Sequence, residues 1–193
     1  MTIGSKRKSI NHRKAFTLPA LHHPPTILDI EASGFGAQSY PIEIGVARAD
    51  GVRFCRLIKP FSDWQHWDVS AEALHGISRE ELEQYGADPV SVCHDLNQFL
   101  GSSTAYSDGW VVDQPWLIKL YAAAGVQMSF RLSALEYLLN EHQMTHWHDV
   151  KQQLHTAVND TRHRASADAE LIQKTFLTTR EGYNNPMSTQ LKG

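Results

Sequence analysis

Two carboxylates, Asp29 and Glu31, stand two positions apart in a short apolar run at 26–32 (TILDIEA). If this run forms a strand, both side chains project from the same face. Packed carboxylates repel each other and burial penalises each charge, so the pair needs a cation, and a divalent metal ion would supply one. The alternative is an edge strand whose solvent-exposed face carries both acids.

Three further residues could join such a site. Asp113, in SDGWVVDQPWL, stands just before Pro115, where it could instead cap a helix. Asp168 lies in HRASADAEL, where small neighbours would let a helix approach a sheet closely; the alternative is an exposed acid paired with Arg164, four residues earlier. His163 lies five residues before Asp168 and could equally be a surface histidine, because the chain has 11 histidines.

These residues belong to three segments, 28–35 (LDIEASGF), 107–117 (SDGWVVDQPWL) and 163–169 (HRASADA). Supporting segments are IEIG at 42–45, Lys59-Pro60 and LHGIS at 74–78. In order and spacing, from about residue 26 to 176, they resemble the DEDDh branch of the DnaQ-like 3′–5′ exonuclease superfamily, which includes RNase T-like enzymes. The third segment has the family's His-x-Ala-x-x-Asp form. Ala32-Ser33 replaces the family's common Thr-Thr, and Ser107-Asp108 replaces its usual His-Asn.

The resemblance implies an α/β fold, with an RNase H-like mixed β-sheet flanked by helices, and hydrolysis of phosphodiesters with two metal ions. Oxygen ligands favour Mg²⁺ or Mn²⁺ over Zn²⁺. By the resemblance, Asp29 would bridge both ions and Asp113 would support the second. Glu31 and Asp168 would hold the ion that carries the attacking water. His163 would act as the general base, because histidine titrates near neutral pH.

The resemblance also implies that the substrate is the 3′ end of single-stranded DNA or RNA and the product a nucleoside 5′-monophosphate. Ser33, Gly34 and Phe35 would contact the terminal nucleotide, with the Phe35 ring stacked on its base; a core-facing phenylalanine is the alternative. A freestanding exonuclease is the favoured form. The alternatives are a proofreading subunit of a polymerase and a catalytically idle nucleic-acid-binding or scaffold module of the same fold. Some members of the family pair, so a homodimer is compatible with the resemblance.

Two other sets of residues compete for a site. Asp108 adds an acid five positions before Asp113, but only Asp113 has a leucine four residues later, as the family pattern asks. Residues 142–155 could place two histidines on one helix face, as zinc sites do. No glutamate stands in the general-base position of an HExxH motif, so an ordinary polar helix is the favoured interpretation. The residues concerned are His142, His146, His148, Asp149 and His155.

The elements that must position these residues follow from apolar periodicity and turn signals. We expect strands at 26–32, 42–49, 52–58 and 104–107, with Asp50-Gly51 as a hairpin turn. We expect helices at 78–86, 89–100, 115–124 (with Pro115 in the first position), 133–141, 150–158 and 165–177. Strands first, then strands alternating with helices, indicate one α/β domain around a mixed sheet.

Composition narrows the classes of protein. The 193 residues contain 41% hydrophobic and 20% charged side chains, as globular proteins do. Five of the 18 bases lie in the first 14 residues, which leaves 13 bases against 21 acids in residues 15–193. A partner that carries phosphates must therefore bind at a local site rather than over the whole acidic surface. We expect a basic tail at 1–24, an exonuclease domain at 25–180 and a second tail at 181–193. No apolar run is long enough for a membrane-spanning helix and the N-terminus has no apolar signal-peptide region, so we expect neither a membrane protein nor a secreted one. The two cysteines lie outside any CxxC pair, which favours the cytoplasm.

Overall fold

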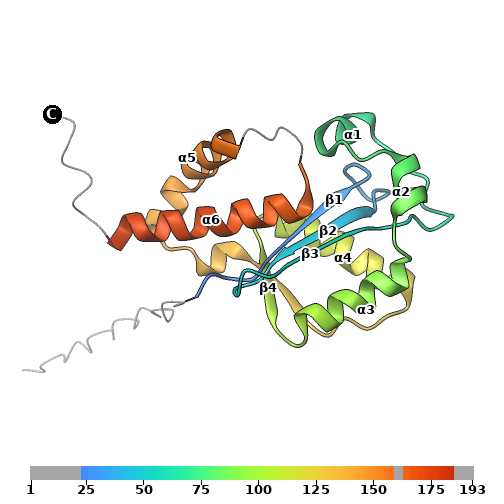
Figure 1. The fold of residues 1–193 in the computed structure, drawn as a ribbon, viewed down its shortest axis with the longest axis horizontal. Coiled ribbons are helices and arrows are strands. Elements are labelled where there is room, and N and C mark those ends of the chain that lie inside the picture. Colours follow the sequence, from blue (N-terminus) through green and yellow to red (C-terminus); the bar gives the residue numbers. More distant parts are fainter. Residues whose placement is uncertain (1–22, 159–162, 185–193) are drawn as a thin grey trace, which may run out of the picture.

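Five strands form a mixed sheet with the order β3-β2-β1-β4-β5 in the computed structural model, which describes residues 23–158 and 163–184 (Figure 1). The antiparallel pairs are β1 (Ile27–Ala32) with β2 (Pro41–Ala47), and β2 with β3 (Arg53–Leu57). β4 (Thr104–Ser107) and β5 (Arg131–Ala134) run parallel to β1. The expected hairpin turn joins β2 to β3, with the Arg48 amide donating to the Val52 carbonyl at 2.9 Å.

Helices cover both faces of this sheet. α6 (Ala165–Asn184) packs on β1 and β2, and α5 (Glu141–Val158) packs on α6. α3 (Pro89–Leu100) and α4 (Trp110–Ala124) lie on the opposite face, as Figure 1 shows. The short helices α1 (Val69–His75) and α2 (Arg79–Tyr85) and the 3₁₀ turn η1 (Leu135–Leu138) complete the fold. Within the described residues, no helix is long and apolar enough to cross a membrane.

The alternation of side chains along β1 divides the core in two. Leu28 and Ile30 belong to the larger core, under α3 and α4, whereas Ile27 belongs to the smaller core, under α6. Because successive side chains alternate in a strand, Asp29 and Glu31 face the same side as Ile27, toward α6. The strand therefore has an apolar face and a face that is acidic at its C-terminal half.

Two expected helices are wrong in part. Residues 133–141 do not form one helix, because Ser133 pairs with Tyr106 in the β4–β5 ladder and cannot cap a helix. The real cap is Asn140, whose side-chain oxygen accepts from the Gln143 amide at 2.8 Å and starts α5. Pro115 does not open its helix: α4 begins five residues earlier, at Trp110.

The start of α4 is set by residues before it. The Ser107 hydroxyl accepts from the Gly109 amide at 2.9 Å, and the Gly109 carbonyl accepts from Asp113 at 3.1 Å. Pro115 has no amide hydrogen to donate to the carbonyl of Val111, so the helix lacks one backbone hydrogen bond in its first turns.

Other boundaries differ more simply. α1, capped by Asp68 and ended by the left-handed Gly76, was not expected. α5 and α6 are longer than predicted, and α6 continues to Asn184, into the expected C-terminal tail. The remainder of that tail and nearly all of the basic segment at 1–24 lie outside the described residues.

Candidate functional site

The five residues of the expected catalytic set line one pocket of about 560 Å³. Two come from β1, one from the first turn of α4, one from the first turn of α6 and one from the segment just before α6: Asp29, Glu31, Asp113, Asp168 and His163. The pocket lies where β1 and β4 end, because the carboxyl ends of parallel strands share an edge of the sheet. Residues from 29 to 168 are thus brought together in one pocket.

One side of this pocket brings together three side chains that could act as metal ligands. Glu31, His163 and Asp168 each offer a ligand atom, and these atoms lie within 4.8 Å of one another. The Nδ1 atom of His163 is 3.4 Å from an Asp168 carboxylate oxygen, and 48% of the His163 side chain is exposed. His163 is therefore accessible from solvent while it lies beside the acids.

Asp113 occupies the other side of the pocket and is only 2% exposed. The Ser107 hydroxyl donates to its carboxylate, and the same hydroxyl accepts from the Gly109 amide. Asp113 is thus an acid of the first helical turn rather than the helix cap considered above. The Ser107 hydroxyl thus links the Asp113 carboxylate to the residue that precedes α4.

The electrostatics of the pocket are those of crowded acids. Burial raises the pKa of Asp29 well above its ordinary value, and the charge of Asp113 raises it further. Burial, then the charge of Asp168, raises the pKa of Glu31 to about 8. Burial also raises the pKa of Asp113 to about 7, against the hydrogen bond from Ser107, and raises the pKa of Asp168. All four shifts mean that the charged form of each acid is less favourable in the folded chain than in water, so added positive charge in the pocket would stabilise the ionised acids.

Nearby cations supply that charge only in part: Lys151 lowers the pKa of Asp113 and of Asp168, but the nearest lysine and arginine are paired with other acids. Lys151 Nζ lies 2.6 Å from an Asp108 oxygen. The Arg164 side chain binds Glu43, so the Arg164–Asp168 ion pair that the sequence allowed does not form. Asp108 therefore pairs with α5, whereas Asp113 lines the pocket. The donor set that remains is rich in oxygen, which suits a hard divalent cation.

The expected substrate-binding residues divide into two kinds. Phe35 is 68% exposed at the edge of the pocket, 6.1 Å from the Trp116 ring centre, and Gly34 also lines the pocket. Phe35 is thus not a core-facing phenylalanine. Ser33 is buried: its hydroxyl accepts from the Tyr40 amide at 3.1 Å and contacts His66, so its side chain holds the loop together.

One wall of the pocket was missed from the sequence. It is a polar stripe on α5 with the spacing i, i+3, i+4, i+7, made of His148, Lys151, Gln152 and His155. The His155 ring stacks 6.1 Å from that of His163. The sequence signal was present in the histidine-rich segment at 142–155, which was interpreted as an ordinary polar helix, with a zinc site as the alternative. In the described part of the chain, these helix histidines are not among the groups of three that could hold a metal ion.

Comparison with known proteins identifies the fold. No protein-family model and no curated protein matches the sequence. Among solved structures, exonuclease I from Methylocaldum szegediense aligns with a TM-score of 0.60 and 12% identity, over 85% of this chain and 41% of that one. E. coli exonuclease I bound to a dA16 oligonucleotide aligns with a TM-score of 0.59 and 14% identity, over 84% and 42%. The zinc-bound complex of the E. coli enzyme with single-stranded DNA gives 0.57 and 12%, over 84% and 41%.

The chain thus spans about two fifths of the length of the exonuclease I chains that it matches. At such identities the likeness concerns the fold alone. It confirms the expected α/β architecture, in which a mixed five-stranded sheet is flanked by helices, and the chain shares this fold with exonuclease I.

Proposed function

We propose that this protein is a metal-dependent 3′–5′ exonuclease that removes nucleoside 5′-monophosphates from single-stranded DNA. The observation that carries the proposal is the convergence of four carboxylates and one histidine in a single pocket, on a fold shared with exonuclease I. The choice of DNA is favoured by the oligonucleotide complexes of those neighbours. RNA remains a second arm of the test.

The pocket fits divalent cations. Its acids have raised pKa values and the cations beside them are neutralised elsewhere, so a site that must work near neutral pH needs added positive charge. Asp29, Glu31, Asp113 and Asp168 would hold two Mg²⁺ or Mn²⁺ ions. Such ions activate water for attack on phosphorus and stabilise the leaving oxygen.

The protein's own groups supply the remaining functions. His163, exposed beside Asp168, would accept the proton of the attacking water. The Phe35 ring would stack on the terminal base, which is sequence-tolerant because every base has an aromatic face. His148 and Gln152 on α5, which line the pocket, would donate hydrogen bonds to the phosphate backbone of the substrate.

The test compares single-stranded DNA and RNA oligonucleotides labelled at the 5′ end and incubated with Mg²⁺, Mn²⁺ or EDTA. We expect shortening from the 3′ end, release of nucleoside monophosphates and complete loss of activity in EDTA. Asp29→Asn should abolish hydrolysis, while Asp95→Asn, which changes an exposed acid on α3, should not. Binding without hydrolysis in every metal would instead support the idle nucleic-acid-binding module.

A further inference from the structure

Glu43 is a fully buried glutamate that lies outside the proposed metal-binding set. It stands on β2 directly opposite Glu31 on β1, so both side chains project from the face that carries α6. Two acids opposite each other on adjacent strands repel, and a buried carboxylate must be paired. The partner of Glu43 is therefore informative about how this face of the sheet is organised.

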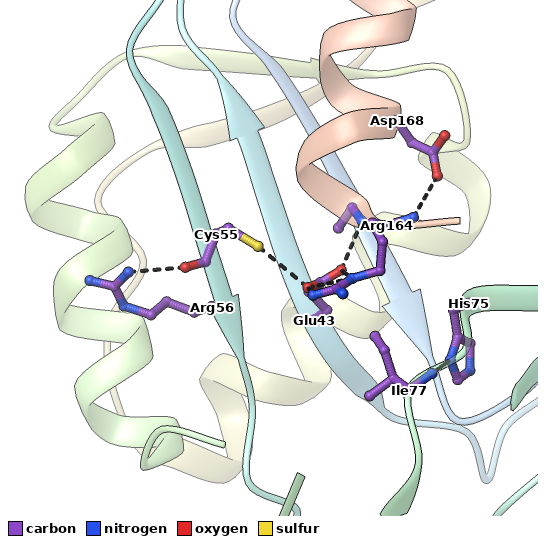
Figure 2. A network of polar contacts seen from close by, with 8 residues as sticks. Glu43, Cys55, Arg56, His75, Ile77, Arg164 and Asp168 are labelled. Atoms are coloured by element: carbon purple, nitrogen blue, oxygen red, sulfur yellow. Dashed lines mark hydrogen bonds and ion pairs between the residues drawn. The ribbon is translucent and has the colours of Figure 1, made fainter. Parts of the chain in front are cut away.

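That partner is the segment that carries His163 and Asp168. Arg164 donates from Nε to both Glu43 oxygens at 3.1 Å and from Nη2 to one of them at 2.6 Å. The Ala165 amide donates to the second oxygen at 2.9 Å, and the Cys55 thiol to the first at 3.3 Å. Figure 2 shows Glu43 between Cys55 on β3 and Arg164 at the start of α6. One carboxylate thus ties two strands to the first residues of this helix.

The same junction is shaped by Gly45, two positions further along β2. A Cβ atom at Gly45 would lie 2.1 Å from the Ala165 carbonyl carbon and 2.1 Å from the Ser166 nitrogen. The start of α6 therefore rests directly on the backbone of β2, with the Glu43 carboxylate beside it. This contact leaves little freedom in where the helix begins.

The backbone of Arg164 is hydrogen-bonded directly to Asp168 of the proposed active site. Its backbone amide donates to an Asp168 carboxylate oxygen at 3.1 Å, and its carbonyl accepts from the Asp168 amide at 2.9 Å. The neighbouring His163 amide donates to the Leu74 carbonyl at 3.1 Å. A shift of Arg164 would therefore move Asp168 and the residue proposed as the general base.

We infer that Glu43 and Arg164 are positioning residues that hold His163 and Asp168 in the geometry required for metal binding and catalysis. The inference rests on the proposed metal site. The ion pair neutralises Glu43 next to Glu31 and fixes the start of α6 at the same time. Residues that orient metal ligands typically change metal affinity or activity about 10- to 100-fold when they are replaced.

The experiment must separate positioning from stability. Glu43→Gln and Arg164→Met each leave one member of the pair unpartnered, which lowers stability. The double variant Glu43→Gln/Arg164→Met leaves no unpaired charge, so it should recover much of the melting temperature. Arg53→Gln is the matched control, because Arg53 also joins β3 to α6 through an ion pair, with Glu170 at 2.5 Å, but at the exposed surface.

Two readouts are needed: the Kd for Mn²⁺ alone, from the electron paramagnetic resonance signal of the free ion, and kcat and KM on a single-stranded oligonucleotide. We expect about 10- to 100-fold weaker Mn²⁺ binding and a similarly lower kcat, with unchanged KM, in both single variants and in the double variant. Arg164→Lys keeps the positive charge but loses the paired N–H donors of the guanidinium, so its Mn²⁺ affinity and kcat should lie between those of the wild type and of Arg164→Met. Arg53→Gln should match the wild type.

Several results would overturn the inference. One is a double variant that recovers Mn²⁺ affinity and kcat together with stability, because the pair would then be only structural. Others are single variants with wild-type Mn²⁺ affinity, or a wild type that binds no Mn²⁺. If the variants lose Mn²⁺ affinity but the wild type hydrolyses neither DNA nor RNA, the proposed exonuclease activity fails and the positioning role stands.

Discussion

The stability of the metal-free protein should fall as the pH rises from about 4.5 to about 8. The reason lies in Glu31, whose pKa is raised from 4.5 to about 8 by burial and by the charge of Asp168. Between these two values the folded protein holds a proton that the unfolded chain has already released. Stability is therefore fully present below pH 4.5 and is lost as the pH rises through 8.

The magnitude follows from the size of the shift. At about 1.4 kcal/mol for each pKa unit, the change at Glu31 amounts to about 5 kcal/mol. The pKa of Asp113, raised to about 7, changes stability in the same direction, but the two acids belong to one charge cluster, so their contributions do not simply add. A loss of about 5 kcal/mol is comparable with the entire stability of many domains.

Urea denaturation at pH 5 and pH 8, with EDTA or with Mg²⁺, measures this effect through the extrapolated free energy of unfolding. Mg²⁺ should stabilise the protein strongly at pH 8 and weakly at pH 5, because protonated acids do not bind it. NaCl at equal ionic strength is the control for screening. Glu31→Gln should flatten the pH dependence. Equal stability at both pH values in EDTA, or equal stabilisation by Mg²⁺ at both, would refute the reasoning.

Two further substitutions test the site and its support. Gly45→Ala should destabilise the fold by at least about 3 kcal/mol in urea denaturation, because the added Cβ would meet Ala165 and Ser166 at 2.1 Å; a near-neutral result would mean that α6 does not rest on β2. Phe35→Ala should raise KM for single-stranded DNA about 5- to 150-fold, the equivalent of about 1–3 kcal/mol of stacking. Because Phe35 is 68% exposed, the melting temperature of the variant should equal that of the wild type. An unchanged KM would mean that Phe35 does not contact the substrate.

Four of the five strands and the shared face of Asp29 and Glu31 could be predicted from the sequence because their signals are local, whereas β5 was not expected and its last residues lay in a segment predicted to be a helix. The alternation in β1 places Asp29 and Glu31 on one face whatever packs against it. The turn at Asp50-Gly51 and the helix stop at Gly101 also depend only on neighbouring residues. The roles given to the acids came from the resemblance of the three motifs and remain predictions.

The features that were missed depend on contacts between distant residues. Ser133 has the sequence pattern of a helix cap, but it pairs with β4 in the sheet. Pro115 has the pattern of a first helical residue, but the contact between Ser107 and Gly109 lets the helix begin earlier. Arg164 is four residues from Asp168, so a local ion pair was a reasonable alternative. Its true partner, Glu43, is 121 residues away. No periodicity connects such positions, and only the packing of α6 on β2 does so.

The placement of charge on this face of the sheet is itself an argument for function. Glu31 and Glu43 stand opposite each other, yet only Glu43 has a counter-ion, Arg164. Among the described residues, neither Asp29 nor Glu31 forms a salt bridge. A fold selected for stability alone would be expected to pair these acids as it paired Glu43, or to replace them with apolar residues. Acids left uncompensated beside a compensated one are better explained by a cation that binds from solution.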